Sequence, residues 1–155
     1  MSEYRYLLER TWTADPRSRR VLWVMLNPST ADDQDDDPTI RRCAAFSVRQ
    51  GASGLSVVNL YALRCTDPRG LRSHPDPVGP ENRSRMAESL AAAAAGGWLV
   101  VCAWGARAEA ERAAEVLAAV RAAGLVPLAL GLTHQGHPRH PLYVPAATNL
   151  TRYNP

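Results

Sequence analysis

The apolar run Val21–Leu26 ends abruptly at the polar sequence Asn27-Pro28-Ser29-Thr30. Continuous apolar runs of about six residues are typical of strands buried on both faces, as in the middle of a parallel sheet. Asn followed by Pro favours an extended backbone that then turns. In open α/β sheets ligands bind beyond the carboxyl ends of the strands, so these polar residues are candidates for a binding site. The alternative is a simple turn in which Ser29 or Thr30 caps the next segment.

Further apolar segments of strand length alternate with segments of helical character. We expect core strands at 21–26, 55–61, 98–104 and 126–130, and helices at 38–49, 81–95 and 106–123. Because strand and helix alternate, the sequence predicts a three-layer α/β/α fold with a central, mostly parallel four-stranded sheet. Asp37 and Pro38 fit the N-cap and first position of the first helix. Residues 4–12 favour an edge strand, and a short last strand can form near 142–144.

The composition is that of an ordinary globular protein, with 46% apolar and 21% charged residues. With no internal repeat or boundary, residues 1–155 are expected to form one domain. The longest apolar run, 90–101, is broken by two glycines and cannot span a bilayer, and the chain begins without a secretion-signal pattern. We therefore expect a cytoplasmic protein that does not bind membranes.

The three cysteines and the basic residues carry weaker signals. Cys43, Cys65 and Cys102 occur singly beside apolar segments, which favours buried free thiols over metal ligation. All 18 basic residues are arginine, and the net charge of +3 is only a weak indication of a polyanionic partner.

Asn59 lies at the end of the second core strand, and Trp104-Gly105 ends the third. A buried carboxamide must satisfy up to four hydrogen bonds or cost a few kcal/mol. Either the backbone of a neighbouring loop or a ligand can satisfy it. A carboxamide offers a donor and an acceptor together, which matches the edge of a nucleobase.

The segment 133–143 holds three of the four histidines, His134, His137 and His140. Metal-binding histidines would be expected on a rigid element with a carboxylate nearby, whereas this segment has the composition of a Gly/Pro loop. We therefore favour a catalytic interpretation over metal binding, in which one histidine acts as an acid or electrophile facing a developing negative charge.

The acidic run Asp32–Asp37 raises the alternative of a metal-dependent hydrolase that uses these carboxylates together with the histidines. The run does not fit a calcium loop, because it has no central glycine and no following bidentate Glu. A solvated loop that adds negative charge at a helix N-terminus explains it better. The sequence contains neither a standard phosphate-binding Gly-rich loop nor a Gly-x-Ser-x-Gly elbow.

Several of these segments together resemble an uncharacterised bacterial and phage family known as a domain of unknown function. The resemblance covers nearly the whole chain and brings no established activity. Its motifs are Met25–Asp32, Asp37–Cys43, Val58–Ala62, Asp76–Asn82, Ala103–Gly105 and His140–Tyr143.

More distantly, five segments resemble, in the same order, motifs of the uracil-DNA glycosylase superfamily. They are Asn27-Pro28, Ala45–Val48, Val57–Asn59, Val101–Gly105 and His137–Leu142. By this resemblance Phe46 stacks on an extruded base, unless it only forms the core face of its helix, and Asn59 reads the base edge. The histidine loop stabilises the departing base, with His137 and His140 both as candidates.

Two departures from that superfamily affect the expected activity. Asn27 stands where a water-activating Asp is usual, as in the mismatch-directed branch with slower catalysis. Ser29 stands where a bulky Tyr excludes 5-substituted pyrimidines, which would open the pocket.

The resemblance implies a nucleobase-recognising protein that hydrolyses the N-glycosidic bond of uracil or of a modified or mismatched pyrimidine. The alternative is a non-catalytic module that binds a nucleotide or modified base. We expect a monomer whose partner is single- or double-stranded DNA or a nucleoside or nucleotide, with no cofactor and no metal. The expected catalytic residues are Asn27, His137 and His140, and the expected substrate-binding residues are Pro28, Ser29, Thr30, Phe46, Asn59, Trp104 and Arg139.

Overall fold

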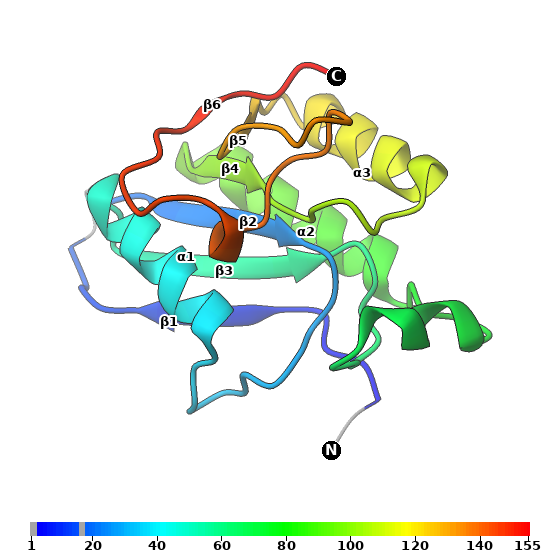
Figure 1. The fold of residues 1–155 in the computed structure, drawn as a ribbon. Helices are drawn as coiled ribbons and strands as arrows, with labels where there is room; N and C mark the ends of the chain where they lie inside the picture. Colours follow the sequence, from blue (N-terminus) through cyan, green and yellow to red (C-terminus); the bar gives the residue numbers. More distant parts are fainter. Residues whose placement is uncertain (1–2, 16–17) are drawn as a thin grey trace.

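The computed structural model describes residues 3–15 and 18–155, which form an α/β fold around a six-stranded sheet (Figure 1). The strands are β1 (Leu8–Thr11), β2 (Arg20–Met25), β3 (Gly54–Asn59), β4 (Leu99–Cys102), β5 (Pro127–Ala129) and β6 (Thr151–Arg152). The α-helices are α1 (Pro38–Arg49), α2 (Asn82–Gly96) and α3 (Ala110–Ala122), and two 3-10 helices are η1 (Pro68–Ser73) and η2 (Pro141–Tyr143).

The sheet has the strand order β1-β3-β2-β4-β5-β6. The four inner strands pair in parallel, while β1 and β6 pair antiparallel at the two edges. The predicted α/β class with a mostly parallel sheet is therefore confirmed. The expected number of four strands is wrong, because both edges are extended by antiparallel strands.

Helices cover both faces of the sheet. Alternate residues of β2 divide between two cores: Val21, Trp23 and Met25 pack on the α1 side, and Leu22 and Val24 pack on the side of α2 and α3. This division follows from the two-residue period of a strand that is buried on both faces. The long apolar run recognised in the sequence is thus the central strand of the fold.

The ends of α1 and α2 follow the local sequence signals. The carboxylate of Asp37 accepts a hydrogen bond from the backbone N–H of Ile40 at 2.9 Å, so the predicted N-cap of α1 is confirmed. Gly97 ends α2 in a left-handed conformation, with φ of 65°, that glycine adopts without strain.

The start of α3 and the last strand differ from the sequence-based expectation. α3 begins at Ala110 rather than at residue 106, because Glu109 is extended and donates its backbone N–H to the Tyr61 hydroxyl at 3.0 Å. Residues 141–143 form the helix η2 instead of part of a strand, and the last strand is β6. No helix among the described residues is long and apolar enough to cross a membrane.

The buried indole N–H of Trp23 donates a hydrogen bond to the Ser47 hydroxyl at 2.9 Å, and we predict that this bond stabilises the fold. Ser47→Ala leaves this donor without an acceptor, which should lower the free energy of unfolding by about 1–3 kcal/mol. Urea denaturation measures the change. Ser84→Ala, at an exposed hydroxyl on α2, is the control and should change it by less than about 0.5 kcal/mol. Equal effects of the two substitutions would contradict the prediction.

Candidate functional site

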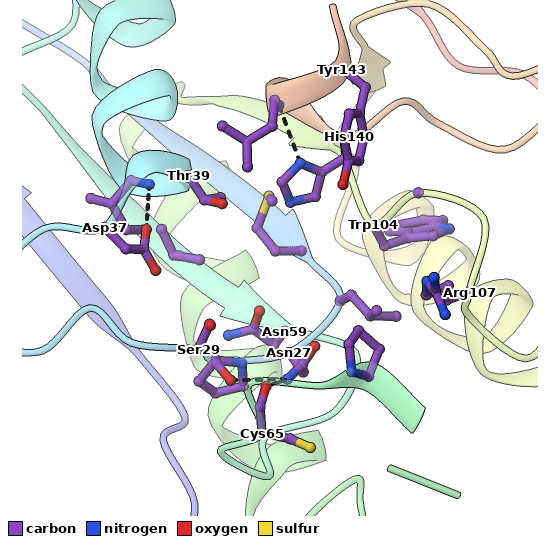
Figure 2. A pocket seen from close by; sticks show the side chains of 18 of the residues that line it. Asn27, Ser29, Asp37, Thr39, Asn59, Cys65, Trp104, Arg107, His140 and Tyr143 are labelled. Carbon is purple, nitrogen blue, oxygen red and sulfur yellow. Dashed lines mark hydrogen bonds between the residues drawn. The ribbon is translucent and has the colours of Figure 1, made fainter. Parts of the chain in front are cut away.

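A cavity of about 580 Å³ lies where β2, β3 and β4 end (Figure 2). Its volume falls within the range of small-molecule sites in proteins. Asp37 and Thr39 line it from the start of α1, Trp104 and Arg107 from the segment after β4, and His140 from the segment before η2. The carboxyl ends of parallel strands therefore form a ligand-sized hollow, as expected for an open α/β sheet.

The structure brings most of the predicted site residues together. Seven of the ten line the cavity: Asn27, Pro28, Ser29, Asn59, Trp104, Arg139 and His140. Thr30 and His137 are not part of its lining. Phe46 is also outside it, because this side chain packs on Trp23 in the core beneath α1, with the ring centres 6.3 Å apart. Of the two interpretations of Phe46, the structure shows the core face of the helix.

Asn59 is a buried residue whose carboxamide is in contact with the cavity and lacks a partner among the described residues. The residue is only 3% exposed and lines the cavity, yet none of the described residues forms a hydrogen bond with its side chain. Its backbone is held firmly, since the side chain of Asn82 donates to the carbonyls of Asn59 and Leu60, at 2.9 and 3.2 Å. Arg112 donates to the same Leu60 carbonyl at 2.8 Å. The amide is thus fixed in place without using its own donors and acceptor.

Asn27 is oriented by its side-chain nitrogen. This nitrogen donates to the backbone carbonyls of Pro28 and Cys65, at 2.9 and 2.6 Å (Figure 2). Both amide hydrogens are therefore engaged, and the side-chain oxygen is left as the acceptor that Asn27 can offer to a ligand or a water molecule.

The His140 imidazole lies across the cavity from Asn27 and Asn59 (Figure 2). Its Nδ1 accepts the backbone N–H of Leu142 at 3.2 Å, so the neutral ring carries its proton on Nε2. Burial lowers the pKa of His140 below 6.5, and the charge of Asp37 opposes this shift only in part. His140 is therefore a neutral hydrogen-bond donor near pH 7.

The position of His140 depends on contacts between η2 and α1. Arg42 of α1 donates to the carbonyl of Pro141 at 3.1 Å and to that of Val144. Beside His140, Tyr143 is 77% exposed, and its ring centre lies 5.5 Å from that of the imidazole. Together with the exposed Leu142, it gives the mouth of the cavity an apolar surface.

The carboxylates of the acidic run Asp32–Asp37 form local hydrogen bonds and ion pairs. Asp32 accepts the backbone N–H groups of Gln34 and Asp35, which lowers its pKa, while Asp36 pairs with Arg10 at 2.7 Å. Within residues 3–15 and 18–155, no group of three His, Cys, Asp or Glu side chains has an arrangement suited to a metal ion. Asp37 caps α1, as the sequence indicates.

Arg5 is a cavity residue that the sequence analysis missed. It is 8% exposed and reaches the cavity wall from the segment before β1. Its position depends on a bridge between Tyr4 and Leu63, a pairing across almost sixty residues. No local sequence signal could have indicated it.

The sheet and the cavity at its edge define an α/β protein with a ligand-sized site at the carboxyl ends of parallel strands. Residues 5–142 match the family model described as a protein of unknown function (DUF1643), and the chain belongs to this family. The expected resemblance to an uncharacterised domain is thereby confirmed. The comparisons with curated proteins and with solved structures each found no match.

The lowered pKa of His140 predicts how stability depends on pH. Because the folded chain disfavours the charged ring, this group's contribution is complete above about pH 6.5 and is lost as the pH falls through the lower folded pKa. His140→Asn keeps an acceptor for Leu142 but removes the titration, so the free energy of unfolding should fall less steeply below pH 6.5. Urea denaturation from pH 5 to 8 compares the two proteins. Identical slopes would contradict the prediction.

Proposed function

We propose that this protein binds a nucleobase in the cavity and hydrolyses its N-glycosidic bond, with uracil or a modified or mismatched pyrimidine in DNA as the substrate. The observation that carries the proposal is the carboxamide of the buried residue Asn59, which lines the cavity and has no hydrogen-bonding partner among the described residues. Burying an unpaired amide costs free energy that a ligand can recover by hydrogen bonding to it.

The edge of a pyrimidine-2,4-dione suits Asn59 chemically. The carboxamide nitrogen can donate to a base carbonyl while its oxygen accepts the neighbouring ring N–H. One such paired contact contributes about 1–3 kcal/mol of discrimination between bases. The rigid backbone at Asn59 and Leu60 lowers the entropic cost of this recognition.

His140 has the features needed to stabilise the departing base. In the proposed reaction, a water oxygen bonds to the sugar C1′, and the electron pair of the C1′–N bond leaves with the base. Negative charge then develops on a base carbonyl, and the proton lost by water finally protonates the base. The neutral Nε2–H of His140 would donate to that carbonyl. A preorganised donor of this kind contributes about 3–4 kcal/mol to the transition state.

Asn27 and the aromatic residues complete the proposed site. The free oxygen of Asn27 would orient the attacking water without removing its proton, which is weaker assistance than a carboxylate gives. Phe46 lies in the core, so stacking on the base falls to the rings that line the cavity, Trp104 and Tyr143.

Asn59→Ala tests the proposal. We expect binding and cleavage of the substrate to fall by about 5- to 150-fold, because the base edge loses its partner. The assay measures abasic sites in single- and double-stranded oligonucleotides that carry uracil, a thymine mismatch or a 5-modified pyrimidine. Asn154→Ala makes the same chemical change at an exposed position and should have no effect.

A stability measurement separates a functional role of Asn59 from a structural one. Because its carboxamide makes no hydrogen bond with residues 3–15 or 18–155, Asn59→Ala should leave the free energy of unfolding unchanged or raise it. If wild-type protein neither binds nor cleaves any of these substrates, the proposed function is wrong.

One observation favours a second function, a module that binds a base without cleaving it. Asn27 cannot act as a general base, and its amide nitrogen is committed to the backbone. Asn27→Ala separates the two functions in the oligonucleotide assay. If the protein is an enzyme, cleavage by this variant falls more than binding, whereas for a binding module wild type and variant both bind without turnover.

A further inference from the structure

Two arginines beside the cavity have buried donors without acceptors. The Nη1 of Arg5 donates to the carbonyl of Ala31, but its Nε is fully shielded and has no hydrogen-bond partner in the part of the chain that the structure describes. The Nε of Arg64 is buried and unpartnered in the same way. Arg64 directly precedes Cys65 and Thr66, which line the cavity together with Arg5.

The backbone pairing brings these arginines onto one side of a short ladder. Tyr4 bridges Leu63 in antiparallel fashion, the N–H of Arg5 donates to Ala62 at 2.9 Å, and the N–H of Arg64 donates to Glu3 at 3.0 Å. Because side chains alternate along a strand, Arg5 and Arg64 share a face as diagonal neighbours. Such neighbours are about 7–8 Å apart at the backbone, within reach of long side chains.

The positive charge at this place is not neutralised by an ion pair. Among the described residues, neither Arg5 nor Arg64 has a carboxylate within ion-pair distance. Glu3, opposite Arg64, is engaged by His74 at 2.6 Å. Burial and then Arg64 lower the pKa of Arg5, while the carboxylates of Asp37 and Asp33 oppose this shift. Buried charges in proteins are normally paired, so this arrangement is costly in the absence of an anion.

We propose that Arg5 and Arg64 form an anion-binding subsite in the cavity wall, which takes a phosphate or carboxylate group of the ligand. Two oxygens of such a group can accept from two guanidinium groups at once, and hydrogen bonds of this charge-assisted kind are the strong ones. The identity of the ligand rests on the proposed function. With a nucleobase at Asn59, the anion belongs to the same nucleotide or to an acidic substituent on the base.

Two sources could supply the anion. A phosphate would come from the backbone of the nucleotide whose base the cavity holds. A substituent at the 5-position of a pyrimidine would instead lie near Ser29, which lines the cavity two residues before Ala31, whose carbonyl accepts a hydrogen bond from Arg5.

Inorganic phosphate tests the subsite independently of any nucleobase. In the wild-type protein, titration with phosphate followed by NMR should shift the Nε–H resonances of Arg5 and Arg64 in a saturable manner. Chloride at equal ionic strength should not shift them. Arg64→Met should weaken phosphate binding about tenfold or more. Arg72→Met, at an exposed arginine of η1, should leave it unchanged. Because the NMR titration uses the wild-type protein, it tests the subsite even if a variant such as Arg5→Met fails to fold.

Nucleosides identify the source of the anion. Affinities for uridine, uridine 5′-monophosphate and 5-carboxyuridine are compared by calorimetry in wild type and in Arg64→Met. We expect one anionic compound to bind at least about tenfold more tightly than uridine, with the advantage lost in the variant. Phosphate binding without any nucleoside binding would support the subsite and overturn the proposed function. Nucleoside binding with no effect of phosphate or of either acidic group would overturn the subsite.

Discussion

Strand β2 pairs in parallel with β3 on one side and with β4 on the other. The register of these hydrogen-bonded pairs places Met25 opposite Asn59 and Val24 opposite Cys102. This register brings three segments that are distant in sequence out of the sheet at one edge. Alternate residues of β3 face opposite cores, so a slip of one residue would turn Asn59 away from the cavity. Because both faces are buried, such a slip would also misplace the apolar side chains, and the hydrophobic cores therefore hold the site in position.

Beyond the ends of the strands, polar side chains rather than neighbouring strands donate hydrogen bonds to backbone carbonyls. Asn82 and Arg112 bind the carbonyls at Asn59 and Leu60, and Arg42 binds those around η2. Buried carbonyls need donors, and at these positions side chains supply them. These residues therefore position Asn59 and His140 while the carboxamide of Asn59 itself stays free. Side chains satisfy the carbonyls at Asn59 and Leu60, whereas the Asn59 side chain has no partner among the described residues, and this contrast is the reason to propose Asn59 as a ligand contact.

Local sequence patterns predicted the four inner strands and the start of α1, because a continuous apolar run and an Asp-Pro cap each act over a few residues. The edge strand β6 and the delayed start of α3 depend on long-range contacts, such as that from Glu109 to Tyr61, and no local pattern contains them. Phe46 is a different case. It follows Ile40 and Cys43 at intervals of three, the spacing of a buried helical face, so the sequence already held the evidence for its place in the core.

Asn59 and Arg5 together narrow the chemistry of the ligand more than either residue does alone. A neutral base could satisfy the carboxamide but would leave the positive charge of Arg5 without an ion-pair partner among the described residues. A free anion could satisfy Arg5 but would leave the donor and acceptor of Asn59 unmatched. A molecule with both an amide-like edge and an acidic group would match both residues, and each group left unmatched costs binding free energy. The two proposals, taken together, therefore name a nucleotide or an acidic pyrimidine as the ligand in preference to a simple nucleoside.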